Sequence, residues 1–179
     1  MRRIVVLMGS PRKHGNTDLL VNAFIEGAKE NNQVEVVHVS DYKVSPCRGC
    51  NVCYMNENHA CAQKDDMKKI YLKLADADIL VIASPVYFYG ISAQLKTIID
   101  RLHTPMRQQI AIKKTALLLV GAAKIPELFD AIKMQYKLID DFFHLENMGM
   151  VLANGVKEKG DILQSSALKE AVELGRKIK

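Results

Sequence analysis

Residues 4–17 read IVVLMGSPRKHGNT. The first five of these residues are all apolar, and they predict a short strand that is buried on both faces. From Thr17 to about Glu30 the apolar side chains recur at helical spacing. A buried strand that passes through a short polar loop into a helix is typical of the first unit of an α/β fold.

The same alternation of strand and helix continues along the chain. Further apolar strands are predicted at residues 34–39, 79–83, 115–120 and 147–154, and helices at residues 66–75, 92–102, 126–143 and 165–178. Five strands joined by right-handed crossovers predict a doubly wound five-stranded parallel sheet in a three-layer α/β/α arrangement. We find no linker, repeat or low-complexity segment, so residues 1–179 are predicted to form a single domain.

Composition and charge exclude several classes of protein. The length of 179 residues suits one domain, and 49% hydrophobic with 25% charged residues is the balance of a globular chain, not a disordered one. The net charge of +5 is scattered, with no basic helix face and no tryptophan, which argues against nucleic-acid binding. No apolar run approaches the roughly 18 residues that span a membrane, and the first run is too short for a signal peptide. We therefore expect a cytoplasmic protein without a membrane segment.

The loop after the first strand is the first candidate binding site, because ligands of such sheets bind at the carboxyl ends of the strands. GSPRKHGNT (residues 9–17) is neither a Walker loop nor a GxGxxG fingerprint. It places hydroxyl, amide and guanidinium donors at a helix N-terminus, which predicts a phosphate site. The predicted contacts are Ser10, Arg12, Asn16 and Thr17.

Two further residues of this loop have predicted roles. His14 is a candidate contact to the anion, although an exposed loop histidine is the alternative. Gly15 is expected to let the backbone turn tightly. An ordinary strand-to-helix turn capped by Thr17 remains the other interpretation of the whole segment.

The loop after the third strand is the second candidate site. It reads SPVYFYGIS (residues 84–92), with three consecutive aromatic residues that a buried core does not require. Such rings can flank a flat ligand, while Pro85 and Gly90 fix the backbone beside it. The alternative is an apolar loop that packs on the next helix or on a partner subunit. A receiver domain, which shares this topology, is excluded because Gly9-Ser10 and Ser84-Pro85 stand where its acidic residues are needed.

All four cysteines of the chain lie within fifteen residues, in a non-periodic loop at residues 40–65. They are Cys47, Cys50, Cys53 and Cys61. Disulfides do not suit a cytosolic protein, and zinc usually takes two Cys-x2-Cys pairs separated by a longer insert. A [4Fe-4S] cluster and free or redox-active thiols both remain open. As free thiols, the first three are expected to lie near one another on a helical turn.

The two loops together resemble the NAD(P)H-dependent FMN reductase family, and Lys96 and Asp100-Arg101 on the following helix also fit. The resemblance implies a flavodoxin-like fold that binds FMN, with the phosphate at the first loop. It places the isoalloxazine ring at Pro85, Val86, Tyr87, Phe88 and Gly90. A third loop of such proteins falls on residues 121–124 and adds Gly121 as a candidate contact.

What the resemblance implies about function is an oxidoreductase that passes reducing equivalents from NAD(P)H through FMN to a small-molecule acceptor. Quinones, nitro or azo compounds, flavins and ferric complexes are acceptors of this kind. No catalytic acid or base is expected, because the cofactor carries the chemistry. The resemblance also implies a homodimer or homotetramer, with the helix at residues 92–103 as a candidate interface.

The cysteine run is similar to the compact motif of the iron-sulfur flavoproteins, a branch of the same family. That resemblance implies a [4Fe-4S] cluster that exchanges electrons between a ferredoxin-like donor and FMN. The seven-residue spacer and the Ala62 that follows Cys61 depart from the ferredoxin pattern. A third possible function, besides an FMN reductase and an iron-sulfur flavoprotein, is that of a flavin-binding regulatory protein without turnover.

Overall fold

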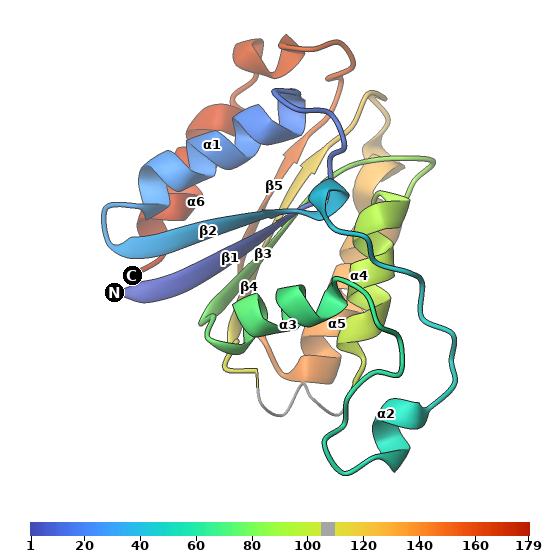
Figure 1. The fold of residues 1–179 in the computed structure, drawn as a ribbon. Helices are drawn as coiled ribbons and strands as arrows, with labels where there is room; N and C mark the ends of the chain where they lie inside the picture. Colours follow the sequence, from blue (N-terminus) through green and yellow to red (C-terminus); the bar gives the residue numbers. More distant parts are fainter. Residues whose placement is uncertain (105–109) are drawn as a thin grey trace.

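The computed structural model describes residues 1–104 and 110–179. Within these ranges the predicted parallel sheet is confirmed, with strand order β2-β1-β3-β4-β5 (Figure 1). The strands are β1 (Arg2–Met8), β2 (Asn32–His38), β3 (Ile79–Pro85), β4 (Lys114–Val120) and β5 (Glu146–Ala153). This order is that of the flavodoxin-like fold, and it reverses between β1 and β3.

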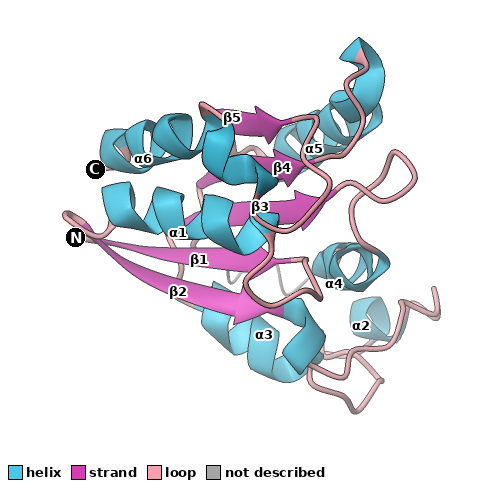
Figure 2. Ribbon diagram, turned by 90° about the horizontal axis from the view of Figure 1, so that it is seen from above, coloured by secondary structure: helices cyan, strands magenta, loops and turns pink. Residues whose placement is uncertain are grey.

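Helices cover both faces of the sheet, as Figure 2 shows. One face carries α1 (Asn16–Ala28) and α6 (Ala167–Lys177), and the other carries α3 (Met67–Ala75), α4 (Ala93–Leu102) and α5 (Asp130–Phe143). Because strand side chains alternate between faces, β1 sends Ile4 and Val6 into the first core and Val5 and Leu7 into the second. This double burial explains why the strands are apolar throughout.

Shorter elements connect these layers. They are the 3₁₀ helices η1 (Val39–Asp41), η3 (Pro126–Phe129) and η4 (Asp161–Gln164) and the one-turn helix α2 (Val52–Met55). The single helix predicted at residues 126–143 is therefore η3 followed by α5, because Pro126 begins a 3₁₀ turn in front of the α-helix. In the described part of the chain, no helix is both long enough and apolar enough to cross a membrane.

α1 and α6 pack closely because a glycine of each helix faces the other. A Cβ added to Gly27 would lie 2.0 Å from the carbonyl oxygen of Val172, and one added to Gly175 would lie 2.3 Å from that of Phe24. Both distances are impossible for real atoms, so the two backbones touch where these glycines stand. The two glycines therefore set how closely α1 and α6 approach each other.

Candidate functional site

The loops after β1 and β3 lie side by side at the carboxyl edge of the sheet. The Gly9 amide donates a 2.7 Å hydrogen bond to the Ala83 carbonyl, which continues the ladder between the two strands. A Cβ on Gly9 would lie 2.9 Å from both Leu95 Cδ2 and Ser92 Oγ at the start of α4. The first predicted loop therefore passes directly against the end of the second, at the point where the strand order reverses.

The N-terminus of α1 has no side-chain cap. The helix begins at Asn16, with Gly15 at the N-cap position and no side-chain hydrogen bond to the first turn. The predicted Thr17 cap is wrong, because Thr17 lies inside the helix and is buried. The amides of the first turn and the positive end of the helix dipole are thus left for an anion.

The tight turn before α1 is at His14, not at Gly15 as predicted. His14 has φ 57°, in the left-handed region, whereas Gly15 has φ −85°. The buried Asp18 carboxylate accepts the His14 amide at 2.5 Å and so holds this conformation from within the helix. Asp18 has no signal in the sequence beyond being acidic in a first helical turn.

Ser10 and Arg12 form the outer part of the same loop. Ser10 is buried, and its Oγ accepts the Arg12 amide at 3.2 Å. The Arg12 side chain is exposed, and no ion pair engages its guanidinium within residues 1–104 and 110–179. The loop therefore combines a fixed backbone with one cationic side chain that can reach an anionic ligand.

Asn16 joins the first loop to the segment after β5. Its Nδ2 donates to the Glu158 carbonyl at 2.7 Å, and its Oδ1 accepts the Gly160 amide at 2.9 Å. Both ends of the Asn16 side chain are thus engaged within the protein. In this conformation the residue holds two loops together at the edge of the sheet.

The aromatic loop after β3 is a strained, exposed turn. Phe88 and Tyr89 have φ 48° and 63°, the left-handed conformation that bulky residues rarely adopt. Tyr87 and Gly90 close the turn by exchanging hydrogen bonds of 2.9 and 3.0 Å. Gly90, which was expected to fix the backbone of this loop, takes part in both hydrogen bonds that close the turn. Strain of this kind is concentrated at functional sites.

The side chains of this turn point away from the core. Phe88 is 98% exposed, and Tyr87 and Tyr89 are also exposed. The three aromatic rings therefore lie outside the core, whereas Val86 and Ile91 of the same loop pack against it; packing of the rings on a partner subunit stays a prediction. Ser84, which was not among the predicted site residues, fixes the base of the loop: its Oγ donates to the Pro85 carbonyl and accepts the Ser92 amide.

Gly121 lies behind these loops. Its amide donates to the Ala153 carbonyl at 2.8 Å and its carbonyl accepts the Val156 amide at 2.9 Å. A Cβ at Gly121 would lie 2.6 Å from Leu128 Cδ2. Because the amide and the carbonyl of Gly121 both make hydrogen bonds within the protein, the residue would contribute to the site only through its lack of a side chain.

The cysteines lie on the long segment between η1 and α3. All four are free; Cys47 and Cys50 are exposed, and Cys53 and Cys61 are partly buried. The expected helical stacking of the first three is wrong, because left-handed Asn51 separates Cys50 from the one turn of α2. Within the described residues, no three His, Cys, Asp or Glu side chains converge closely enough to hold a metal ion. The four thiols lie within fifteen residues of the sequence, and four cysteine thiolates are chemically the donor set of an iron-sulfur cluster.

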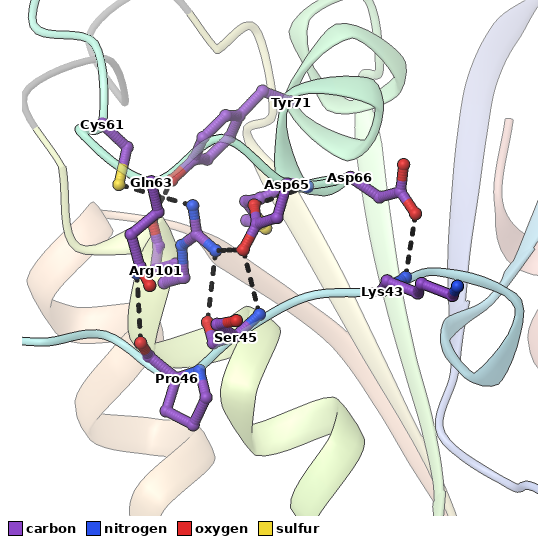
Figure 3. A network of polar contacts seen from close by, with 10 residues as sticks. Lys43, Ser45, Pro46, Cys61, Gln63, Asp65, Asp66, Tyr71 and Arg101 are labelled. Carbon is purple, nitrogen blue, oxygen red and sulfur yellow. Dashed lines mark hydrogen bonds and ion pairs between the residues drawn. The ribbon is translucent and has the colours of Figure 1, made fainter.

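A buried arginine holds this segment against α4 (Figure 3). Arg101 Nη1 donates to Asp65 Oδ2 at 2.5 Å and to the Ser45 carbonyl at 3.2 Å. Its Nη2 donates to Cys61 Sγ at 3.3 Å. The side chain of Arg101 is 2% exposed and that of Asp65 13%, so this ion pair is shielded from water.

The environment of Asp65 favours its charged form. Burial by itself would raise the pKa of Asp65, but hydrogen bonds from Arg101 and from the Ser45 and Met67 amides outweigh it and lower the pKa below its ordinary value. Burial would likewise lower the pKa of Arg101, but the hydrogen bond to Asp65 raises it above the usual range. The pair is therefore ionised at neutral pH.

This network was not predicted from the sequence. The acidic pair Asp65-Asp66 before an apolar-periodic stretch predicts a helix N-cap, and Asp65 Oδ1 does accept the amide of Met67, the first residue of α3, at 3.2 Å. Asp66 makes no cap hydrogen bond and pairs with Lys69, and Asp100 pairs with Lys96 along α4 and not with its neighbour Arg101. A charged residue among the apolar positions of α4 was the available signal that Arg101 reaches a partner elsewhere.

Known proteins resemble this chain in sequence and in fold. The family model described as NADPH-dependent FMN reductase matches residues 2–157. An iron-sulfur flavoprotein of Methanosarcina thermophila is 32% identical over 173 residues, which cover 95% of this chain and 86% of that protein. An iron-sulfur flavoprotein of Methanocaldococcus jannaschii is 38% identical over 125 residues; the match covers 68% of this chain and 63% of that protein, less than two thirds of its length.

A solved structure with the same fold is the NAD(P)H:quinone oxidoreductase from Methanothermobacter marburgensis. Its TM-score to this chain is 0.81 at 18% sequence identity, with 98% of this chain and 96% of that chain covered. At this identity the likeness establishes the fold.

Proposed function

The chain belongs to the NADPH-dependent FMN reductase family, and from this we propose that it is an FMN-dependent oxidoreductase that carries reducing equivalents from NAD(P)H to a small-molecule acceptor. A quinone, a nitro or azo compound, or a flavin is the acceptor class we infer. The observation that carries the proposal is the pairing, at one edge of the sheet, of an uncapped helix N-terminus with an exposed aromatic turn. The first suits a phosphate and the second suits a flat ring.

We assign the phosphate of FMN to the loop after β1. The first-turn amides of α1 would donate to it, together with the Ser10 and Thr17 hydroxyls and the Arg12 guanidinium. His14 lies on the same loop, and its ring would contact the anion while Asp18 holds its amide. Asn16 would contribute mainly by holding the neighbouring loop in place.

We assign the flavin ring to the turn after β3. The residues concerned are Pro85, Val86, Tyr87, Phe88 and Gly90, with Gly121 leaving space behind them. FMN, when bound, supplies the ring that accepts hydride and releases electrons. The chain's own task is to bind and orient that ring and to keep one face accessible, which requires no catalytic acid or base.

The test is a titration of the flavin-free full-length chain with FMN, followed by turnover with NADPH or NADH and menadione. We expect stoichiometric FMN binding and turnover that depends on FMN. A chain that does not bind FMN would overturn the proposal. Tight FMN binding without turnover would instead indicate a flavin-binding regulatory protein.

An iron-sulfur flavoprotein that exchanges electrons with a ferredoxin-like donor is the second candidate. The observation that favours it is the buried guanidinium beside Cys61: Arg101 Nε is buried and has no hydrogen-bond partner among the described residues. A spare buried donor next to a thiol suits a negatively charged cluster. The four cysteines would be its ligands. Iron and sulfide in protein purified without oxygen, and their loss in Cys50→Ala, are the test.

We also propose a cellular location, an oligomeric state and a partner class for the protein. Four free thiols on one surface segment suit a reducing compartment, and we infer a cytoplasmic location. We infer a homodimer or homotetramer in which α4 takes part, and we infer no nucleic-acid partner because the positive charge is scattered. A measurement of the protein's mass in solution tests the inferred oligomeric state.

A further inference from the structure

The cysteine segment is closed at its base by contacts between its two ends. The Lys43 amide donates to Asp66 Oδ2 at 2.9 Å, and the Asp66 amide donates to the Lys43 carbonyl at 3.1 Å. One step further in, the Ser45 amide donates to Asp65 Oδ2 at 2.9 Å. Gln63 Nε2 reaches the Pro46 carbonyl at 3.1 Å. These contacts form a neck, residues 43–46 against residues 63–66, from which the cysteine-bearing part emerges (Figure 3).

Arg101 reaches into this neck from outside it. Its guanidinium binds a carboxylate on one side of the neck, Asp65, and a carbonyl on the other, Ser45. The backbone of Arg101 is itself anchored, because the Tyr71 hydroxyl donates to its carbonyl at 2.6 Å. Burial raises the pKa of Tyr71 to about 12, so this donor keeps its proton throughout the neutral range.

Cys61 differs from the other three cysteines in its contact with the Arg101 guanidinium. Cys61 is the cysteine whose sulfur accepts a hydrogen bond from Arg101, at 3.3 Å. Cys47 and Cys50 are exposed, on the part of the segment that lies beyond the neck. Cys61 is therefore the sulfur that is already fixed in place, directly before the neck.

We propose that Arg101 is the positioning residue of the cysteine segment: it fastens the neck to α4, fixes Cys61 as the first ligand, and balances the negative charge of a cluster bound there. The roles toward Cys61 as a ligand and toward the cluster's charge rest on the iron-sulfur candidate function, whereas the fastening of the neck does not. α4 begins directly after the aromatic turn, so one helix fixes both the proposed flavin loop and the cysteine segment. Hydrogen bonds and positive charge at ligand sulfurs raise the reduction potential of a cluster.

The first arm of the test uses metal-free full-length protein and does not depend on any cluster. Hydrogen exchange is compared in the wild type, in Arg101→Gln and in Arg48→Gln, which removes an exposed guanidinium from the same segment. We expect the Ser45 amide and those of residues 61–66 to exchange about 10-fold faster or more in Arg101→Gln, and at the wild-type rate in Arg48→Gln. Equal rates in all three proteins would overturn the positioning role. If Arg101→Gln does not fold, Arg101→Gln/Asp65→Asn removes the buried unpaired carboxylate and takes its place.

The second arm reconstitutes the same proteins with ferrous iron and sulfide without oxygen. We expect Arg101→Gln to bind iron about 10-fold more weakly or worse and its cluster to have a lower midpoint potential than the wild type. Arg101→Lys is expected to have a midpoint potential between those of Arg101→Gln and the wild type. Lysine keeps the positive charge but lacks the several N–H donors of the planar guanidinium. The role of Arg101 toward the cluster would be overturned if wild type and Arg101→Gln had equal iron affinity and equal midpoint potential. It would also be overturned if Arg48→Gln shifted the midpoint potential as much as Arg101→Gln does. A wild type that binds no iron would overturn the iron-sulfur candidate function, and the exchange arm would then decide the positioning role alone.

Discussion

The Gly9 amide and the Ala83 carbonyl are joined by a 2.7 Å hydrogen bond that carries the pairing of β1 and β3 one residue beyond the end of β1. Because of this bond, the loop that begins at Gly9 leaves the sheet beside the loop that follows Pro85. The two loops then share a boundary at Ser92 and Leu95 of the α4 region. The proposed phosphate and ring sites depend on this boundary.

Gly9→Ala is expected to disturb both sites at once. The new Cβ would lie 2.9 Å from Leu95 Cδ2 and from Ser92 Oγ, so α4 or the loop must shift. We expect a loss of stability of about 1–3 kcal/mol and weaker FMN binding. Urea denaturation measures the loss of stability, and FMN titration measures the loss of affinity. Unchanged FMN affinity would show that the backbone at Gly9 is not part of the FMN site.

Arg12→Ala is expected to weaken FMN binding about 10-fold or more, since a charge-assisted hydrogen bond contributes about 1.5–3 kcal/mol. Riboflavin, which lacks the phosphate, should bind the variant as it binds the wild type. Arg176→Ala, an exposed arginine near the end of α6, is the matched control and should change neither affinity. Equal loss of riboflavin and FMN affinity in Arg12→Ala would show that Arg12 does not bind the phosphate.

Phe88→Gly is expected to stabilise the flavin-free protein and to weaken riboflavin binding. Phe88 is almost fully exposed, so little packing is lost, while its left-handed backbone strain is relieved. The gain should be about 1 kcal/mol after the added chain entropy of glycine. Thermal unfolding and riboflavin titration report the two effects. A variant that gains stability and keeps full riboflavin affinity would contradict the assignment of the ring to this turn.

Gly27→Ala is expected to destabilise the fold without acting on the site directly. Its Cβ would stand 2.0 Å from the Val172 carbonyl oxygen, so α1 and α6 must separate. We expect a loss of about 1–3 kcal/mol or more, measured by urea denaturation. At low temperature, where the variant stays folded, its FMN affinity should remain within about 3-fold of that of the wild type. A 3-fold change in affinity corresponds to about 0.6 kcal/mol of binding free energy.

Asp65→Asn is expected to change the response of stability to acid. The folded pKa of Asp65 is lowered from 3.8, so its contribution is present above the unfolded pKa and is lost as pH falls through the folded value. At pH 7 the variant should lose about 3–5 kcal/mol, because Arg101 is left unpaired. The difference from the wild type should narrow below about pH 4. A difference that stays constant down to acid pH would show that Asp65 is not charged in the folded protein.

The fold could be predicted because the decisive signals are local. Each strand is a short apolar run and each long helix has an apolar side, and these patterns do not depend on distant residues. Their alternation leaves few topologies, since crossovers are right-handed. Boundaries moved by a few residues, as at Asn16, where the helix begins without the cap that the sequence suggested.

The loops were placed correctly at one edge, but their conformations were not predicted. The left-handed turn at His14 depends on the Asp18 carboxylate, and that at Phe88 depends on the bonds between Tyr87 and Gly90. The Arg101–Asp65 pair joins residues 36 positions apart, and no periodic pattern links them. This ion pair is set by tertiary structure, and the sequence shows it only as an unexplained charge among the apolar positions of a helix.

The most direct test of the account is the visible absorption spectrum of the full-length protein, purified without oxygen and supplied with FMN, before and after NADPH and then menadione. We predict a stoichiometric flavin spectrum that NADPH bleaches and menadione restores. A protein that retains no flavin after removal of excess FMN, or whose bound flavin NADPH and NADH leave unchanged, would contradict the proposed function.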